Sequence, residues 1–393
     1  MAVTTTVGAP GTDPDPSVAP APGTRPTTAS TAPPATAPVT TAPIPETTAA
    51  PTSTATTGTT VTMGTTGTPQ PTTIPSNTIG ATRLASQPDT MPLAATSGTP
   101  RVRQLRNGAV VAEYTNLGAG GPFTRTHAWN VTQPGDVFEV YPAVYEGPGQ
   151  YPWIGPLPNN AADYNAGIFQ RPTNITIRGV TVNGRRPVVK LGTTADYNIL
   201  GHGMIEINGV DGLVFENIDI DGTGGTVVDR AGFYVTDSSN VTLRNSRVHG
   251  FQTSQHNGVF DAGANSGYLH LDNVRLYENG GWDGPAHNVY VNAGDIDPNF
   301  TLTLTNSWSS AVNVGHLFKS RAQVTMLDGN LLEGTDAPAG WDCAESFGLD
   351  VPNGGRIAVT NNVFVKAKPG GVPTASPCAT APREWTWRGR TAW

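Results

Sequence analysis

Asparagine recurs at nearly regular intervals through the second half of the chain, and this recurrence constrains the fold more than any other feature. The asparagines that each close a short run of alternating apolar and polar residues are Asn217, Asn245, Asn273, Asn306, Asn330 and Asn362. Their successive spacings are 28, 28, 33, 24 and 32 residues. A repeat of this length is typical of solenoid proteins, in which each turn of the chain stacks on the one before it.

The segments around these asparagines share one pattern. Each contains a short strand, a polar turn, a second strand, the asparagine corner and a third short strand, as in "MIEINGVDGLVFENIDIDG" at 204–222. The apolar residues alternate with a period of two and show no helical periodicity. Leucine-rich repeats would require a fixed leucine spacing that is missing here, and propeller blades would require longer repeats of four strands. The pattern therefore predicts the coils of a parallel β-helix.

The N-terminal quarter has a different composition. Residues 1–98 consist mainly of Thr, Pro, Ala, Gly and Ser, with very few charges. Such a segment cannot bury enough apolar surface to offset the conformational entropy that folding costs, so we expect a disordered stalk or linker. The predicted organisation is a stalk at 1–98, a β-helix domain at 99–380 and a C-terminal cap or tail at 381–393. The cap is suggested by "EWTWRGRTAW", whose aromatic residues suit an end coil or, alternatively, a sugar-stacking surface.

Charge and hydropathy narrow the choice of partners. The formal net charge of −7 argues against nucleic acid or an anionic membrane surface as a partner. No run of residues approaches the roughly 18 apolar positions that membrane insertion requires. The N-terminus lacks the basic start and apolar core of a secretory signal peptide, although the stalk favours an extracellular or cell-surface location. Cys343 and Cys378 form one bridge in an oxidising compartment or remain as two free thiols.

The repeats and the segment "QPGDVFEVYPAVY" at 133–145 resemble the right-handed parallel β-helix proteins of the pectin-lyase-like superfamily. The resemblance covers about residues 128–367. It implies an all-β, single-stranded, right-handed parallel β-helix solenoid. The same fold carries lyases, hydrolases, epimerases and non-catalytic spikes, so the function has to be argued from a site.

Aligning the first strand of each repeat predicts which side chains face outward. The residues expected to form an internal aromatic and apolar stack are Tyr234, Phe260, Tyr290, Phe318 and Leu349. Because side chains alternate along a strand, the following residues should face solvent. These residues are Val235, Asp261, Val291, Lys319 and Asp350, together with Glu206 on an earlier coil.

A lateral patch of chemically active residues is expected near Lys319. His256, His287 and His316 lie near the starts of three successive first strands and should stack at about 5–10 Å from one another. The patch is completed by Asp261, Trp282, Asp283, Tyr290, Lys319 and Arg321, with Tyr290 the doubtful member because the alignment places it inside.

This patch suits β-elimination on a uronate-containing polymer. The reaction needs a cation that neutralises the sugar carboxylate, a base that removes the C5 proton and an acid that protonates the leaving oxygen. We assign Lys319 as base or neutralising cation, Arg321 as carboxylate clamp and His287 or His316 as proton donor. The residues expected to bind substrate are His256, Asp261, Trp282, Asp283 and Tyr290.

The β-helix lyases that cleave chondroitin-type and alginate polymers resemble this stretch at Lys319-Ser320. In that family the lysine is the base, and an arginine on the next coil is the acid. Here the next arginine is Arg356, which lies in a turn, and no cluster of acids matches the family's calcium site. The resemblance therefore implies a lysine base without implying the rest of that mechanism.

Several alternatives remain open. Lys319 and Arg321 are equally compatible with solvated turn positions paired with Asp350 or Glu333, and the histidines with turn capping. Asp219 and Asp221 form a weak candidate calcium site, and no other cofactor is expected. An acidic polysaccharide or surface glycan is the expected partner, with the oligomeric state left open. The competing function is a non-catalytic glycan-binding adhesin, spike or phage-tail component.

Overall fold

The computed structural model describes residues 90–366, except for 125–131, 148, 156–171, 194–201, 226–230, 253–255, 282–285, 293–296 and 335–345. Most of the predicted stalk, the predicted C-terminal cap and both cysteines lie outside the described residues. Within the described part, the secondary structure is all β, without a helix long and apolar enough to cross a membrane.

The chain winds through three strands per turn, as the asparagine spacing predicts. A representative coil consists of β10 (Gly203–Asn208), β11 (Asp211–Glu216) and β12 (Asp219–Asp221). The following coils are β13 (Ala231–Thr236), β14 (Ser239–Arg244) and β15 (Arg247–His249); β16 (Asn257–Asp261), β17 (Ser266–Asp272) and β18 (Arg275–Tyr277); β19 (Val289–Val291), β20 (Thr301–Thr305) and β21 (Trp308–Ser310); and β22 (Lys319–Ser320), β23 (Val324–Asp328) and β24 (Leu331–Glu333). The last described coil adds β25 (Arg356–Thr360) and β26 (Val363–Val365).

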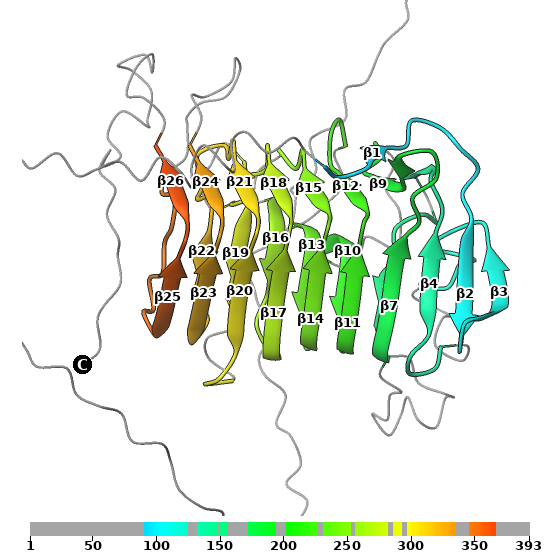
Figure 1. The fold of residues 1–393 in the computed structure, drawn as a ribbon, viewed down its shortest axis with the longest axis horizontal. Coiled ribbons are helices and arrows are strands. Elements are labelled where there is room, and N and C mark those ends of the chain that lie inside the picture. The colour runs from blue at the N-terminus through cyan, green and yellow to red at the C-terminus, as the bar shows by residue number, and fades with distance from the viewer. Residues whose placement is uncertain are drawn as a thin grey trace, which may run out of the picture. The chain divides into compact units, whose positions relative to one another are not determined.

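Equivalent strands of successive coils pair in parallel to form three long sheets (Figure 1). The first sheet has the order β22-β19-β16-β13-β10-β6, where β6 is Trp153–Ile154. The second sheet contains β25-β23-β20-β17-β14-β11 and continues through β7 (Thr173–Gly179) and β4 (Val137–Val140). The third sheet contains β26-β24-β21-β18-β15-β12, then β9 (Val188–Lys190) and β5 (Val144–Glu146). The prediction of a parallel β-helix is confirmed.

The N-terminal end of the second sheet changes from parallel to antiparallel pairing. There β4 pairs with β2 (Val102–Arg106), and β2 pairs with β3 (Ala109–Tyr114), both in antiparallel fashion. This hairpin covers the N-terminal edge of the second sheet, whose strand β4 would otherwise expose unpaired backbone groups. A further short parallel pair joins β1 (Leu93–Ala94) to β8 (Arg185–Arg186). It holds the start of the described chain beside the segment that leads into β9 of the third sheet.

Stacked apolar side chains fill the interior of the coils. One such row runs through the second sheet from coil to coil and consists of Phe215, Leu243, Leu271, Leu304 and Leu327, all buried. Each full burial of such a side chain contributes about 1.5–3 kcal/mol. Because every coil buries side chains of its neighbours, the stability of each coil depends on the coils packed against it.

The corner between the second and third sheets is built from residues in the left-handed conformation. Asn217, Asn245, Asn273 and Asn306 have φ values of 56°, 51°, 50° and 52°. Asparagine tolerates this conformation better than other residues with a Cβ atom. The Asn273 side chain donates a hydrogen bond to Oδ1 of Asn245, 2.9 Å away, in the manner of the amide ladders that stacked asparagines form.

The predicted alignment of this corner is one residue out in the last two coils. Gly329 and Asn361 occupy the left-handed positions there, with φ values of 68° and 54°. Asn330 and Asn362 follow them and form a separate row, in which Nδ2 of Asn330 donates to Oδ1 of Asn362 at 2.8 Å. Two adjacent asparagine rows therefore account for what the sequence presents as one.

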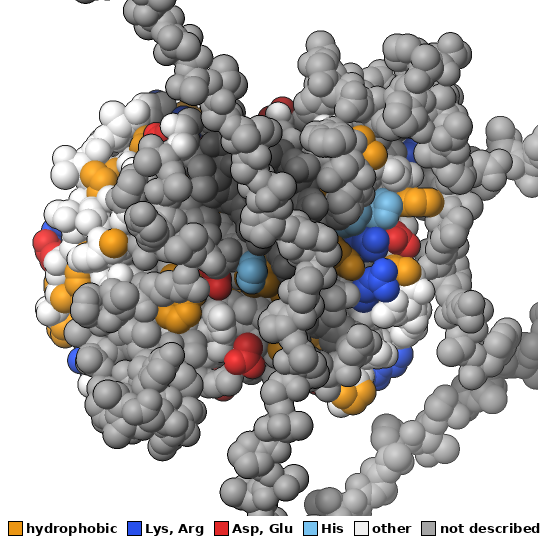
Figure 2. Space-filling model, turned by 180° about the vertical axis from the view of Figure 1, so that it is seen from behind, with side chains coloured by type: hydrophobic (Ala, Val, Ile, Leu, Met, Phe, Trp, Pro, Cys, Tyr) orange, Lys and Arg blue, Asp and Glu red, His pale blue; other side chains and the backbone are white. Residues whose placement is uncertain are grey.

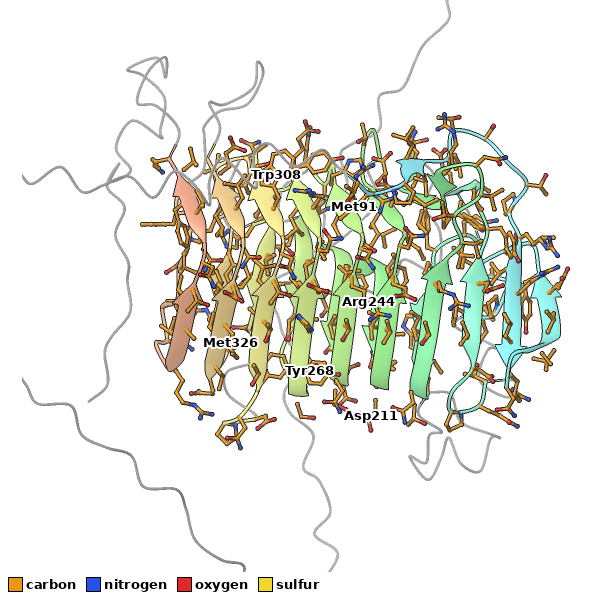
Figure 3. The ribbon with its side chains drawn as sticks, in the orientation of Figure 1. Met91, Asp211, Arg244, Tyr268, Trp308 and Met326 are labelled. Atoms are coloured by element: carbon orange, nitrogen blue, oxygen red, sulfur yellow. The ribbon has the colours of Figure 1, made fainter. Side chains whose placement is uncertain are left out.

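Charges of alternating sign cross the outer face of the second sheet, where Figure 3 labels Arg244. Arg178 pairs with Glu139 at 2.8 Å, and Arg244 pairs with Glu216 at 2.6 Å. Exposed pairs of this kind each contribute at most about 1 kcal/mol. These two pairs therefore form a solvated, charge-matched row on this face.

Candidate active site on the first sheet

The outer face of the first sheet carries one continuous row of large side chains. In order along the sheet, its members are Trp153, Glu206, Tyr234, Phe260, Tyr290, Lys319 and Asp350. The rings of Tyr234 and Phe260 lie 5.6 Å apart, and those of Phe260 and Tyr290 lie 5.2 Å apart. The predicted outward orientation of Lys319 and Asp350 is correct.

The predicted inward orientation of Tyr234, Phe260 and Tyr290 is wrong. Tyr290 pairs in the sheet with Lys319 and not with Phe318. The prediction matched aromatic residues with one another and so paired the last two coils one residue out of register. A shift of one residue exchanges the inner and outer faces of a strand. Phe318 and Leu349 are indeed buried, but Tyr290 stands beside Lys319 on the outer face.

Three residues predicted to face solvent, Val235, Asp261 and Val291, lie instead in the interior row. That row continues through Ser320 and Val351, and all five residues are buried. Asp261 is 0% exposed, so its assignment to a substrate-binding surface is wrong. One of its carboxyl oxygens accepts hydrogen bonds from the Gly263 N–H (2.9 Å) and the Asn265 side chain (2.7 Å). Burial outweighs these bonds and raises the pKa of Asp261 to about 7.

Lys319 lies between an aromatic ring and a carboxylate. Its Nζ is 5.0 Å from the centroid of the Tyr290 ring and 3.9 Å from Oδ2 of Asp350. Burial lowers the pKa of the Lys319 amine; Asp350 opposes part of this effect, and the nearby charge of Arg321 adds to it. A lysine with a lowered pKa reaches its neutral, proton-accepting form more readily than an ordinary lysine does.

Two of the three predicted histidines stack beside this lysine. The rings of His287 and His316 lie 4.4 Å apart and within 12° of parallel, and Nε2 of His316 is 3.3 Å from Oδ2 of Asp350. The hydrogen bond from His316, although opposed by burial, holds the pKa of Asp350 below its usual value. His256 does not join the stack, because Asn257 occupies the equivalent position on its coil. Oδ1 of Asn257 accepts a hydrogen bond from the backbone N–H of His287.

His287 is an internal member of this stack. It is 1% exposed, and its Nδ1 accepts the backbone N–H of His316 at 2.9 Å. Burial, with the charges of His316 and Lys319, lowers the pKa of His287 well below the ordinary value. A neutral, buried imidazole with this bond orients His316 and does not contact a substrate at the surface.

The remaining predicted residues are distributed differently. Arg321 donates through Nη1 to Oδ1 of Asn353 at 2.9 Å, close to Asp350 in the chain. Arg356, the next arginine along the chain, begins β25 in the second sheet, whereas Lys319 lies in the first sheet. Trp282 and Asp283 lie outside the described residues. Figure 2 shows the basic, histidine and acidic side chains gathered together on this face of the molecule.

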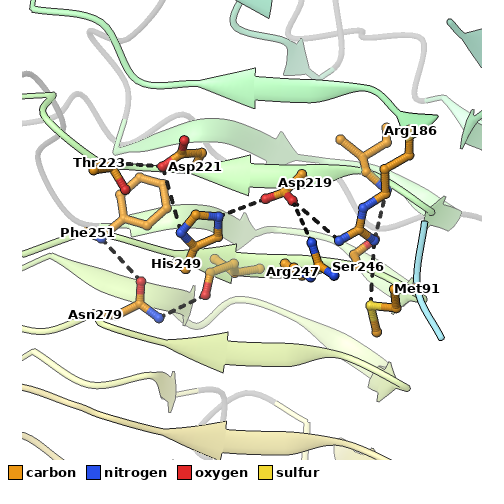
Figure 4. A network of polar contacts seen from close by, with 12 residues as sticks. Met91, Arg186, Asp219, Asp221, Thr223, Ser246, Arg247, His249, Phe251 and Asn279 are labelled. Carbon is orange, nitrogen blue, oxygen red and sulfur yellow. Dashed lines mark hydrogen bonds and ion pairs between the residues drawn. The ribbon is translucent and has the colours of Figure 1, made fainter. Parts of the chain in front are cut away.

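A second polar cluster, on the third sheet, was not assembled by sequence reasoning (Figure 4). Asp219 is bound by Nε2 of His249 at 2.8 Å and by the guanidinium groups of Arg186 and Arg247, each at 3.4 Å. Burial alone would raise the pKa of Asp219, but these three partners hold it below its usual value. The 28-residue distance from Asp219 to Arg247, one coil, is the signal that could have identified this pair.

The proposed calcium ligands belong to this cluster. The cations of the protein itself already surround the Asp219 carboxylate, which makes it a poor ligand for a metal ion. Over the described part of the chain, no three His, Cys, Asp or Glu side chains converge in a way that could hold a metal.

In comparisons with known proteins, no family model matches this chain, and neither a curated protein nor a solved structure matches it significantly.

Proposed function

We propose that this chain is a carbohydrate-active β-helix protein that cleaves a uronate-containing polysaccharide by β-elimination. The observation that carries the proposal is the position of Lys319. Its amine stands on the outer face of the first sheet, at the end of a row of aromatic rings and in contact with an ionised acid that also binds His316. The likeness of the repeats to pectin-lyase-like proteins, and of Lys319-Ser320 to their lysine bases, supports the same reaction.

The aromatic row supplies a track for the polymer. Phe260 and Tyr290 are both partly exposed, on neighbouring coils, with ring centroids 5.2 Å apart. Aromatic faces stack on sugar rings, so a polymer running along the sheet would place one sugar beside Lys319. Arg321 then serves as the cation that binds the sugar carboxylate, because a guanidinium pairs with a carboxylate through two hydrogen bonds.

The elimination follows from these positions. The neutral Lys319 amine takes the proton from C5, the released electron pair forms the C4–C5 double bond, and the C4–O bond to the leaving sugar breaks. His316 delivers a proton to the leaving oxygen, and Asp350 holds and stabilises the imidazolium form that precedes this step. His287 orients His316 through the bond to its backbone N–H.

A non-catalytic glycan-binding protein is the second candidate, and the ion pair between Lys319 and Asp350 favours it. A protonated lysine whose charge is balanced by a neighbouring carboxylate is suited to structural support of a binding face. Binding along the aromatic row requires Phe260 and Tyr290 but no proton transfer, so the two functions differ in what removal of the Lys319 amine does.

We expect Lys319→Met to reduce β-elimination at least about 100-fold, because a positioned base contributes about 10²–10⁴ in rate. Alginate, pectate and chondroitin sulfate are incubated with the protein, and the ultraviolet absorbance of the unsaturated uronate product is followed. The wild-type rate should rise with pH as the Lys319 amine loses its proton, with a midpoint below the ordinary lysine value.

Lys190→Met is the matched control, because Lys190 lies on the third sheet and is removed from this site. It should leave the rate unchanged. Absence of unsaturated product from all three polymers, with polymer binding that depends on Phe260 and Tyr290, would establish the non-catalytic alternative.

A further inference from the structure

A cavity of about 440 Å³ opens at the corner between the second and third sheets, which is distinct from the first sheet that carries Lys319. One wall is the N-terminal segment 90–92, which leads into β1. The opposite wall is the asparagine corner of three successive coils, Asn217, Asn245 and Asn273, with Arg178 and Glu216 beside it. The volume is in the range that small-molecule sites occupy.

The amide row is interrupted on both sides of its Asn273–Asn245 bond: beyond the cavity, Nδ2 of Asn306 donates to Oδ1 of Asp272 at 2.9 Å, and the other break lies in the cavity wall. Asn273 donates to Oδ1 of Asn245, and a regular ladder would continue from Nδ2 of Asn245 to Oδ1 of Asn217. Nδ2 of Asn217 donates to the preceding coil, to the carbonyl oxygen of Gly179 (2.6 Å) and the hydroxyl of Thr181 (3.1 Å). Among the described residues, however, no hydrogen bond joins Nδ2 of Asn245 to Oδ1 of Asn217, so this donor and this acceptor are both left over.

A buried arginine ties the backbone of the asparagine wall to the N-terminal wall. The fully buried guanidinium of Arg186 donates to the backbone oxygen of Asn245 at 2.9 Å and to Sδ of Met91 at 3.6 Å (Figure 4). Arg186 thus connects the N-terminal wall of the cavity to the asparagine wall. The backbone of the asparagine wall and the Met91 side chain are therefore held by one buried group.

These groups define the chemistry of a ligand. An uncommitted amide donor lies one coil, about 4.8 Å, from an uncommitted amide acceptor. Two adjacent hydroxyl groups match this pair, since one can accept from Asn245 while the other donates to Asn217. The two charged residues among the described lining, Arg178 and Glu216, are already paired with Glu139 and Arg244, which favours a neutral ligand over an ionic one.

We propose that this cavity binds one neutral pyranose unit of a glycan through two adjacent hydroxyl groups. Pro92 and Met91 supply apolar surface for the C–H face of the sugar ring, as sugar sites require beside their polar groups. The proposal does not rest on the lyase activity, since it concerns another corner of the solenoid and an uncharged sugar.

The test uses paired glycine substitutions. Asn245 and Asn306 both have left-handed backbones on the same corner row, and glycine retains that conformation while removing the amide. Asn306 does not line the cavity. The full chain is titrated with D-glucose, D-galactose, D-mannose and N-acetylglucosamine, and the side-chain amide signals are followed by ¹⁵N–¹H NMR.

We expect at least one of these sugars to shift the Asn245 amide signal. Asn245→Gly should weaken its binding at least tenfold, whereas Asn306→Gly and Lys319→Met should bind as the wild type does. Asn245→Asp retains the acceptor for Asn273 but removes the donor, and should weaken binding to a similar degree.

The proposal is overturned if none of the four sugars binds, or if Asn245→Gly and Asn306→Gly behave alike. It is also overturned if Lys319→Met abolishes sugar binding, because the sugar would then occupy the first sheet. The two proposals can fail separately. Lyase activity without sugar binding at the corner would contradict only the present proposal, and sugar binding without lyase activity would contradict only the proposed β-elimination.

Discussion

Asp219→Ala is expected to destabilise the protein by about 3–5 kcal/mol, the usual cost of leaving a buried charge without its partner. The carboxylate is almost fully buried and binds His249 and two arginines. One of them, Arg186, is 0% exposed, so the variant would retain a guanidinium charge that water cannot reach. Urea-induced unfolding, followed by circular dichroism, measures the loss.

Asp221 provides the matched control because it lies two residues further along the same short strand. Its contacts are the Thr223 N–H at 2.8 Å and the longer approach of His249 Nδ1 at 3.7 Å. Asp221→Ala should cost about 1 kcal/mol or less, since its side chain remains partly solvated. Equal losses in the two variants would show that the Arg186 charge is not compensated mainly by Asp219.

The second large effect concerns pH and Asp261. Burial raises the pKa of this carboxyl from 3.8 to about 7, so the folded state holds a proton that the unfolded state has already released. Stability from this group is therefore fully present below about pH 4 and is lost as the pH rises to about 7. A difference of about three pKa units corresponds to about 4 kcal/mol.

We expect Asp261→Asn to remove this dependence. The asparagine retains an oxygen for the Gly263 and Asn265 donors but does not titrate. Other acids also bind protons at low pH, so the informative quantity is the difference between wild type and variant at pH 5 and pH 8. That difference should favour the wild type by about 3 kcal/mol more at pH 5. An unchanged difference would mean that Asp261 is ionised at both values.

Recognising the coil depended on local patterns, and this part of the prediction was reliable. Short alternating strands and corner asparagines are dictated by backbone preferences within a few residues, as the left-handed Asn217 and Asn245 show. Register between coils was harder to predict. Tyr290 could be matched with Phe318 or Lys319, and only packing of the whole coil selects the second pairing.

The same distinction applies to the candidate site. The side chains of Lys319, His316 and Asp350 were expected on one face, and the structure brings them into contact. His256 and Asp261 were expected there too, but a shift of one residue places Asn257 in the histidine stack and turns Asp261 inward. Burying the Asp261 carboxylate looks too costly in free energy when the residue is considered alone. In the structure two donors bind it, and its raised pKa favours the uncharged form.

The sequence by itself determined that this chain forms a β-helix, because the period, the strand lengths and the corner residues all act locally. Only the tertiary structure decided which residues meet across coils. The Asp219 cluster, the interrupted ladder at Asn245 and the surroundings of Lys319 each join residues about one coil apart or further. Their partners depend on how turns of different length align successive strands, since a pairing that slips by one residue reverses the face that each side chain occupies.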